Sequence, residues 1–288
     1  MTVTTTSASS LAELDRERLF GLDFISDTSI AELTETLLRE AREPTVDWRC
    51  VVTPNVDHLI RYDLNDADAS VATDAVVVLP DGMPIVWASK LLGRPLSCRL
   101  TGSDLFAELW PKLARRSWPT VLVAPSEEVA ACLAMEHRNM HAIVAPWFDT
   151  DDVAAASALA DQIDAVAVSA CFVIIAVSMP KHHLLARLLH ERWAHRREPS
   201  PIVVLLGASP EFYLGLTKRA PMWMQRAGLE WVHRLTLDPR RMAKRYLVDD
   251  IRIARLIHRE WRRIKRPATS PRLGRGRRPR QRRPSSAP

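Results

Sequence analysis

Paired cysteines are missing from this sequence. The 288 residues contain four cysteines, which are far apart and include no CxxC pair: Cys50, Cys98, Cys132 and Cys171. Small disulfide-stabilised domains and zinc sites depend on closely spaced cysteines, so neither is expected. Isolated cysteines of this kind are typically small buried side chains in a reducing cytoplasm. We therefore expect a cytoplasmic chain that binds no metal.

Long hydrophobic runs are also missing. No uncharged apolar stretch reaches the length of about 18 residues that a membrane-spanning helix needs. The longest apolar run near the middle of the chain, Ala165–Met179, contains two serines and a cysteine and is typical of a buried strand with its flanks. The N-terminus has no basic start followed by an apolar run, which argues against a secretory signal. An apolar content of 47% still allows a full core.

Acidic residues are scarce in the C-terminal quarter. Residues 216–288 contain 22 Lys or Arg but only 5 Asp or Glu, a net charge of +17. Residues 1–215 hold the other 18 basic and 29 acidic residues, a net charge of −11. A net charge of +6 therefore hides an acidic body joined to a cationic extension. This asymmetry predicts a polyanionic partner, such as a membrane surface, nucleic acid or a phosphorylated substrate.

Short β-branched runs alternate with amphipathic helical patterns in the body. The expected buried parallel strands are 49–53, 75–79, 120–124, 141–145, 172–177 and 202–206. The expected helices lie near 30–41, 82–93, 104–116, 126–138, 151–162 and 181–196. This alternation predicts an α/β domain over 19–215, with a Rossmann-like, open, mostly parallel sheet and helices on both faces. Ligands of such sheets bind beyond the carboxyl ends of the strands.

A basic helical appendage is expected at 216–266. One helix should begin at Pro221 and end before Pro239. A second, at about 240–264, carries basic and apolar residues on adjoining faces: Arg241, Arg245, Arg252, Arg255 and Arg259 beside Met242, Tyr246, Ile253, Ile257 and Trp261. This pattern is typical of a basic amphipathic helix at a membrane surface.

The two ends of the chain lack a pattern that predicts fixed structure. Residues 1–18 are expected to be flexible, and the Pro/Arg/Ser-rich tail 267–288 to be disordered. Such a tail binds nucleic acid non-specifically as readily as anionic lipid. No nucleic-acid-binding fold motif accompanies it, so the expected partner is an anionic membrane surface rather than nucleic acid.

Polar residues follow the first two of the expected parallel strands. They are Thr53-Pro54-Asn55 and Pro80-Asp81-Gly82. Two polar clusters at adjacent strand ends suit a sugar-nucleotide or another polyol. Asp81, a carboxylate at a strand terminus, is a candidate general base, and Gly82 beside it leaves room for substrate. The alternative for Asp81-Gly82 is a turn or a helix cap.

These pieces occur in the order of a known family. The matching blocks are TPNVDHLI at 53–60, LPDGMPIVWASKLLGRPLSCRLTGSDLF at 79–106, a weaker VSMPKHH at 177–183, and KRAPMWMQRAGLEWVHRL…DPRRMAKRYL within 218–247. With them, the chain resembles the TagA/WecG/CpsF family of glycosyltransferases over about residues 19–247. That family makes wall teichoic acids, enterobacterial common antigen and related polysaccharides.

The resemblance implies a reaction. Members are inverting transferases that need no metal and no cofactor, and pass an N-acetylmannosamine-type or related sugar from UDP to a polyprenyl-diphosphate-linked sugar. It also implies a Rossmann-like domain followed by an appendage that covers the active site at the membrane. The chain is then expected in the cytoplasm, peripherally bound to the inner face of the cell membrane. The sequence leaves its oligomeric state open, a homo-oligomer included.

The resemblance also implies roles for particular residues. Asp81 would deprotonate the acceptor hydroxyl, while Thr53 and Asn55 would line the sugar pocket. Arg234 and Arg241 would reach the donor diphosphate, because the guanidinium fork matches phosphate oxygens and offsets the charge that develops on UDP as it leaves.

Two departures from the family pattern leave alternatives open. Where members commonly have Gly-x-Gly-Ala-Pro-Lys-Gln-Glu, this chain has Ala176–His183, and the family's Phe-Asp-Phe is Pro210-Glu211-Phe212. Both changes point to a reshaped donor pocket. The alternatives are a transferase with another donor, such as UDP-glucose, and a non-catalytic relative that binds membrane or nucleic acid.

Two further motifs can be interpreted either as functional sites or as structural features. Asp149-Thr150-Asp151 has the form of a metal-binding DxD motif, but it precedes an alanine-rich helix, where acidic residues favour the N-terminus. His182 and His183 are adjacent, so both are not expected to face one site, although one can reach a ligand from the strand end.

Overall fold

The computed structural model describes residues 10–218 and the helix 239–265, together with seven single positions between them: 220, 221, 223, 224, 229, 232 and 236. Side chains of that helix are described from Arg252 onward. The tail expected at 267–288 lies outside the described residues. Residues 10–18, expected to be part of a flexible N-terminus, form a short 3-10 helix and the start of a strand, because Leu11 and Leu14 are buried.

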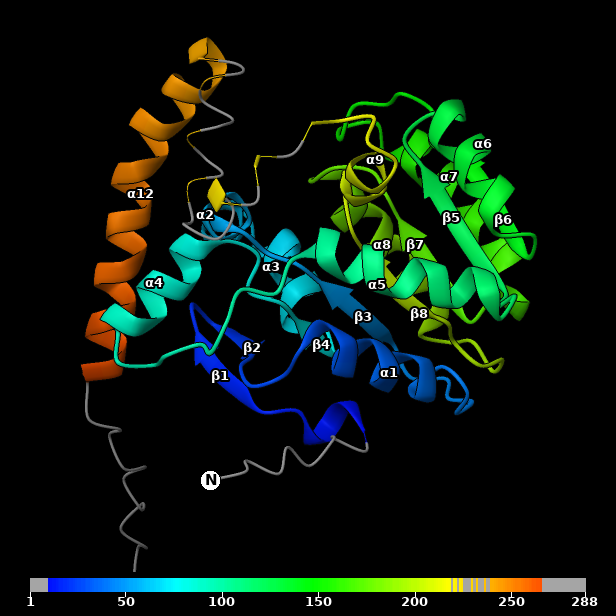
Figure 1. Ribbon diagram of the computed structural model, residues 1–288, viewed down its shortest axis with the longest axis horizontal. Coiled ribbons are helices and arrows are strands. Elements are labelled where there is room, and N and C mark those ends of the chain that lie inside the picture. Colours follow the sequence, from blue (N-terminus) through cyan, green and yellow to red (C-terminus); the bar gives the residue numbers. More distant parts are fainter. Residues whose placement is uncertain are drawn as a thin grey trace, which may run out of the picture.

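The described core is an eight-stranded sheet in the order β1-β2-β4-β3-β8-β7-β5-β6 (Figure 1). The strands are β1 Arg16–Leu19, β2 Leu22–Ile25, β3 Arg49–Val52, β4 Val77–Val78, β5 Thr120–Ala124, β6 Met140–Val144, β7 Phe172–Ile175 and β8 Ile202–Leu205. Only the pair β1–β2 is antiparallel among these. Strands β3, β7 and β8 are buried along their whole length, as apolar strands covered on both faces are.

Helices cover both faces of the sheet. They are α1 Ile30–Glu40, α2 Val56–Leu64, α3 Asp66–Thr73, α4 Met83–Leu91, α5 Gly102–Arg115, α6 Glu127–Glu136, α7 Val153–Val166, α8 Lys181–Trp193, α9 Ser209–Tyr213 and α12 Pro239–Lys265, with 3-10 turns η1 Leu11–Glu13 and η2 Ala167–Ser169. Side chains of α2, α3, α7 and α8 enter one hydrophobic cluster, and those of α1, α5 and α6 enter another on the opposite face. The predicted Rossmann-like architecture is confirmed.

Some features of the body were not predicted from the sequence, although a strand near its start was. Helices α2 and α3 fill the connection between β3 and β4, where no helix was expected. The β1–β2 hairpin adds an antiparallel edge beside β4. Its turn places Phe20 and Gly21 at positive φ, a conformation that glycine adopts without strain.

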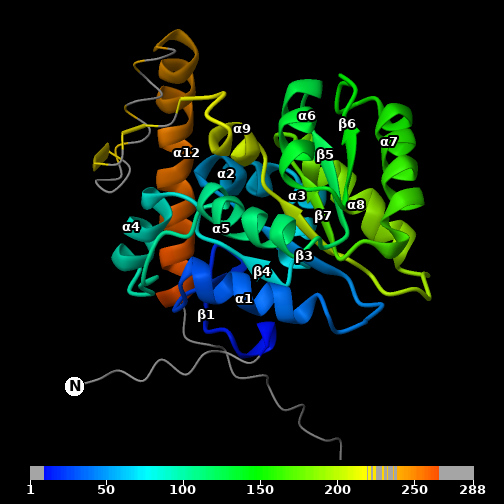
Figure 2. The same cartoon turned by 45° about the vertical axis from the view of Figure 1, so that its right-hand side comes forward.

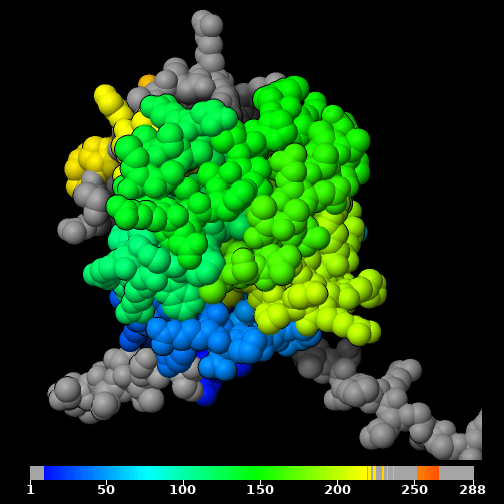
Figure 3. All heavy atoms as spheres, turned by 90° about the vertical axis from the view of Figure 1, so that its right-hand side faces the viewer, coloured from blue at the N-terminus to red at the C-terminus, as the bar shows by residue number. Residues whose placement is uncertain are grey.

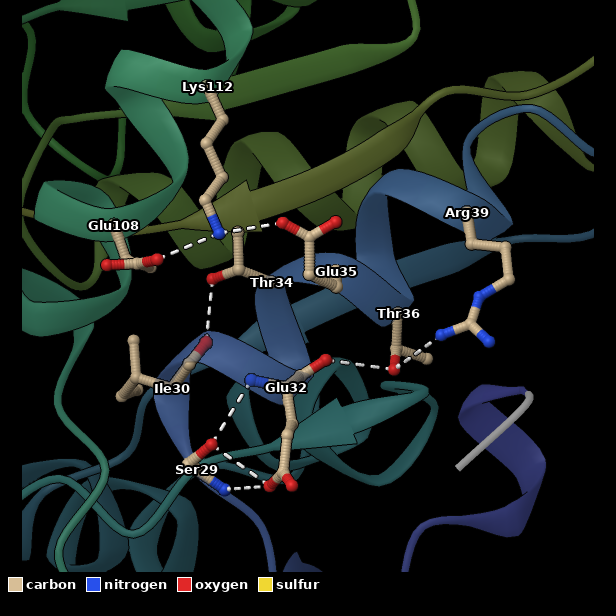
Figure 4. A network of polar contacts seen from close by, with 9 residues as sticks. All are labelled: Ser29, Ile30, Glu32, Thr34, Glu35, Thr36, Arg39, Glu108 and Lys112. Atoms are coloured by element: carbon tan, nitrogen blue, oxygen red, sulfur yellow. Dashed lines mark hydrogen bonds and ion pairs between the residues drawn. The ribbon is translucent and has the colours of Figure 1, made fainter. Parts of the chain in front are cut away.

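A network of polar contacts joins α1 to α5 (Figure 4). Ser29 and Glu32 form a capping box at the N-terminus of α1, an arrangement that stabilises a helix by about 1 kcal/mol. On the exposed side, the Lys112 ammonium of α5 lies 2.8 Å from carboxylate oxygens of Glu35 and Glu108. Lys112 therefore ties α5 to α1, and α5 is the helix whose N-terminus reaches the strand ends described below.

Helix α12 packs along one edge of the body, beside α2 and α4 (Figure 2). Leu256 is buried in the core, and Ile253 and Ile257 line an apolar crevice with side chains of α2 and α4. Arg259 forms an ion pair with Asp63 at the end of α2. The opposite end of the molecule (Figure 3) is built by the middle of the chain, in green. None of the helices in the described part combines the length and apolar content needed to cross a bilayer.

The helix predicted at about 240–264 is thus present as α12. Its apolar stripe is divided between two environments: Ile253 and Ile257 face the body, whereas the Trp261 side chain is exposed. The helix expected between Pro221 and Pro239 lies mostly outside the described residues.

Candidate active site

Three neighbouring strands of the sheet, β4, β3 and β8, end at the same edge (Figure 1). The loops after them are joined through the backbone. The Leu79 N–H donates to the Val52 carbonyl at 2.9 Å, and the Asp81 N–H donates to the Pro54 carbonyl at 3.1 Å. The two loops that were predicted to carry polar site residues are therefore held side by side.

Asp81 is half-buried at the end of this edge and meets the N-terminus of α5. The Gly102 N–H donates to the Asp81 carboxylate at 3.4 Å. A helix N-terminus carries partial positive charge, which stabilises a nearby carboxylate. Asp81 is thus fixed by a strand on one side and a helix end on the other.

Thr53 lies beside the same helix end. Its hydroxyl donates to the Leu205 carbonyl of β8 at 3.4 Å. A β-carbon added at Gly102 would stand 3.0 Å from the Thr53 hydroxyl and 3.3 Å from the Ser209 hydroxyl. Ser103 completes the group, its hydroxyl 3.4 Å from that of Ser209. We call Thr53, Asp81, Gly102, Ser103 and Ser209 the strand-end cluster.

The structure therefore brings Thr53 and Asp81 together, as predicted, but it also adds Ser209. Ser209 was not predicted from the sequence. A signal was present, since Gly207-Ala208-Ser209 follows the strand expected at 202–206. The Thr101–Asp104 turn caps α5, with the Thr101 hydroxyl accepting from the Asp104 N–H at 3.0 Å.

Gly82 matters more for its backbone conformation than for the space that it leaves for a substrate. It lies at φ +124°, in a region that side chains disfavour, and precedes the first turn of α4. A β-carbon there would meet only the Pro84 ring, at 3.7 Å. Gly82 thus allows the chain to turn from Asp81 directly into α4.

Asn55, predicted to line the sugar pocket, is the N-cap of α2. Its side-chain oxygen accepts from the backbone N–H groups of Asp57 at 3.0 Å and His58 at 3.3 Å. The His58 ring lies 2.7 Å from the same oxygen through Nδ1. The amide oxygen is thus occupied by the helix, and the amide nitrogen is the group left to contact a ligand.

Three histidines gather behind Asn55, which the sequence did not predict. The His58 ring stacks parallel on His182 with centroids 5.8 Å apart, and His183 lies 6.0 Å from His58. His182 and His183 both point into the body because they form the first turn of α8, packed against α2. The expectation that both do not face one site is wrong.

Hydrogen bonds order this histidine cluster. His182 Nδ1 donates to the Val177 carbonyl at 2.8 Å, and His183 Nε2 lies 2.8 Å from the Tyr62 hydroxyl. Burial lowers the pKa of His58 to about 3 and that of His182 to about 4. It also holds the pKa of His183 well below its usual value. All three rings are neutral at pH 7.

The arginines predicted to reach the diphosphate are not placed. Arg234 lies outside the described residues, and Arg241 belongs to α12 in the part whose side chains are not described. Their roles stay predictions.

The Asp149-Thr150-Asp151 motif is a turn. Asp149 accepts from the Thr150 N–H at 2.7 Å, while the N-cap of α7 is the following residue, Asp152. The expectation that the motif itself caps the helix is therefore wrong by one residue. Among the described residues, no group of three His, Cys, Asp or Glu side chains has an arrangement that could hold a metal ion. This includes the cluster of three histidines.

An aromatic surface at the other end of the same sheet edge was not predicted. The Lys181 ammonium lies 5.4 Å from the ring centre of Trp147 and 4.7 Å from that of Phe148. The Trp147 side chain is almost fully exposed. Phe148 is buried, so Trp147 is the ring open to a ligand. An exposed aromatic ring with a neighbouring cation suits a ligand that is aromatic and anionic.

This arrangement is typical of α/β enzymes, which bind polar ligands at the carboxyl ends of their strands. The chain belongs to the glycosyl transferase WecG/TagA/CpsF family, whose family model matches residues 17–267. The resemblance given by the sequence blocks is thereby confirmed, and with it the class of enzyme, a glycosyltransferase.

Curated relatives carry a specific name, N-acetylglucosaminyldiphosphoundecaprenol N-acetyl-beta-D-mannosaminyltransferase. The protein of Bacillus spizizenii is 27% identical over 223 residues, covering 76% of this chain and 82% of the relative. That of Staphylococcus aureus strain MRSA252 is 24% identical over 251 residues, covering 84% and 91%. That of Bacillus subtilis strain 168 is 28% identical over 169 residues, covering 56% and 61%.

Proposed function

We propose that this glycosyltransferase moves an N-acetylmannosamine-type sugar from a UDP-sugar to a polyprenyl-diphosphate-linked sugar during cell-surface polysaccharide synthesis. One observation carries the proposal: Asp81 stands in the strand-end cluster, next to Thr53 and the N-terminus of α5. The printed names of the relatives support the acceptor class.

Asp81 is the proposed general base. Its carboxylate takes the proton of the acceptor hydroxyl as the hydroxyl oxygen attacks the anomeric carbon of the donor sugar. The bond from that carbon to the UDP oxygen breaks, UDP leaves with the electron pair, and the anomeric centre is inverted. A single displacement of this kind needs one base, and the strand-end cluster contains one carboxylate.

Several groups are proposed to hold the donor. Thr53, Gly82 and the amide nitrogen of Asn55 face the sugar, and Arg234 and Arg241 bind the diphosphate. The exposed ring of Trp147, at the other end of the strand edge, offers a stacking surface for the uracil.

The identity of the donor sugar depends on a segment that departs from the family pattern. His182 and His183 stand where family members commonly have Gln-Glu, and both rings are buried against His58. Neutral rings replace an amide and a carboxylate there, which changes the hydrogen bonds available behind Asn55. Another donor, such as UDP-glucose, is therefore the second candidate.

The cationic end is proposed to keep the enzyme at the inner face of the cell membrane. The exposed arginines of α12 include Arg252, Arg255 and Arg262. Each basic residue close to an anionic surface contributes about 1 kcal/mol to binding. Removing residues 216–288 should release the protein from anionic vesicles and abolish transfer to a lipid-linked acceptor.

The test is UDP release from a panel of UDP-sugars in the presence of a polyprenyl-diphosphate-GlcNAc analogue. We expect acceptor-dependent UDP release with UDP-N-acetylmannosamine. Release with another UDP-sugar alone would transfer the proposal to that donor. No acceptor-dependent release with any donor, from a protein that still binds membrane or nucleic acid, would favour a non-catalytic relative.

A further inference from the structure

We propose that α4 is a membrane anchor: its exposed Trp87 and Leu91 enter the interface of an anionic bilayer, beside Trp261 and the cations of α12. The expectation that this side of the protein meets lipid rests on the proposed function. The choice of these side chains rests on their exposure and on the charge around them.

Helix α4 has two apolar faces. Ile85, Val86 and Ala88 are buried in the body. On the other side, Trp87 is 45% exposed and Leu91 is 74% exposed. These two residues are four apart, so their side chains lie on the same face of the helix, one turn from each other. An exposed leucine alone is ordinary on a protein surface, but a tryptophan next to it is not.

Helix α12 lies beside α4 and also carries an exposed tryptophan. Ile85 and Ala88 of α4 line the same apolar crevice as Ile253 and Ile257 of α12, so the two helices are neighbours (Figure 2). Trp261 follows Ile257 by four residues and is 42% exposed. Trp87, Leu91 and Trp261 are thus exposed apolar side chains on two neighbouring helices. We call them the interfacial trio.

The positive charge around these side chains favours anionic lipid as the partner of this surface. The described part of α12 carries six exposed cations: Arg252, Arg255, Arg259, Arg262, Arg263 and Lys265. Arg259 pairs with Asp63 of the body, and Lys90 of α4 is exposed as well. Glu260, the acid in this stretch, is buried and pairs with Arg263 at 2.7 Å. A second copy of the chain would bring like charges together at this face. Tryptophan beside Lys and Arg is the composition that membrane interfaces favour.

The position of α4 fits a lipid-linked acceptor. The helix begins at Met83, two residues after the proposed base Asp81. A bilayer held against α4 would therefore lie next to the strand-end cluster, where the acceptor hydroxyl has to arrive while its prenyl chain stays in lipid. Helix α12 alone gives no such orientation, because its charge attracts a surface without fixing which side of the body meets it.

The experiment is co-sedimentation of the full chain with vesicles of phosphatidylcholine, with and without phosphatidylglycerol. Leu91→Glu and Trp87→Ser, singly and together, should weaken binding to the mixed vesicles, by roughly tenfold for the pair, since each removes an apolar group from the lipid interface. Met135→Glu is the matched control, because Met135 on α6 is 81% exposed and lies outside the interfacial trio. Thermal melts establish that each variant is folded.

Transfer assays separate this inference from the proposed function. The Leu91→Glu and Trp87→Ser variants should lose transfer to a vesicle-borne acceptor but keep it with a short-chain, water-soluble acceptor. If the wild-type protein is inactive on both acceptors, the proposed function is wrong. The sedimentation result would still show whether α4 binds the membrane.

Three results would overturn the anchor. One is vesicle binding by the double variant equal to that of wild type. Another is loss of duplex DNA binding with vesicle binding retained, which would assign the surface to nucleic acid. The third is conversion of an oligomer to a monomer in light scattering with vesicle binding retained, which would assign it to a second copy.

Discussion

The strand-end cluster and helix α12 are attached to the body in different ways. The cluster is built from the ends of three adjacent strands and one helix, joined by backbone hydrogen bonds such as that from Asp81 to Pro54. Helix α12 is held by an apolar seam around Leu256 and by the Arg259–Asp63 ion pair. Side chains that must meet a reacting atom need the rigid support of strands and backbone hydrogen bonds. A helix that only holds the enzyme at a membrane can be attached by side-chain packing and an ion pair.

Replacing Asp81 with Asn tests the cluster and should have the largest effect. Loss of the base should lower kcat by about 10²- to 10⁴-fold, because the amide cannot accept the acceptor proton. UDP binding, measured by calorimetry, should stay close to that of wild type since Asn keeps the shape of the side chain. An unchanged kcat would remove Asp81 from the mechanism.

Replacing Leu256 with Ala tests the seam of α12. The cavity left in the core should destabilise the docking of the helix by about 2 to 4 kcal/mol. Hydrogen exchange should then speed up at α12 while the sheet strands stay protected. Arg255→Ala, at the exposed neighbouring position, is the control. Equal loss of protection in sheet and helix would mean that α12 is part of one cooperative unit with the body.

Acid should loosen the site before it affects the rest of the body. His182 is neutral in the folded protein because burial lowers its pKa from the usual 6.5 to about 4. Because the lowered pKa belongs to the folded state, its contribution to stability is full above pH 6.5 and is lost as the pH falls toward 4. At pH 5 the loss from this residue is about 2 kcal/mol.

Urea unfolding midpoints at several pH values measure this effect. His182→Gln, which does not titrate, should reduce the pH dependence between 6.5 and 4, while His58 and His183 keep the rest of it. A slope identical to that of wild type would mean that His182 is not held neutral by burial.

The Arg259–Asp63 ion pair should have the smallest effect. Both groups are partly exposed, so a double-mutant cycle with Arg259→Ala and Asp63→Ala should give a coupling of about 0.2 to 1 kcal/mol. The coupling should fall in high salt. A value of several kcal/mol would make the ion pair, rather than Leu256, the main attachment of α12.

Much of the fold was predictable because its signals are local. Each expected parallel strand and each expected body helix is present, although β4 is only Val77–Val78. The approach of Thr53 to Asp81 was predictable too, since the carboxyl ends of neighbouring parallel strands meet at one edge.

What the sequence did not predict depends on contacts between distant segments. His58 and His182 stack although they lie 124 positions apart, and no spacing rule relates them. Ser209 joins the cluster because β8 lies next to β3, an order that alternation does not reveal. The pattern of α12 predicted an apolar face correctly, but not that Ile253 and Ile257 would be turned toward the body.

The order of the sheet has an evolutionary consequence. Asp81 follows β4 and the histidine pair follows β7, and β3 and β8 stand between these two strands. Under the proposed function, substitutions in the first turn of α8 would change the donor pocket from a segment that two strands separate from the proposed base. Donor choice and acceptor activation could then evolve separately.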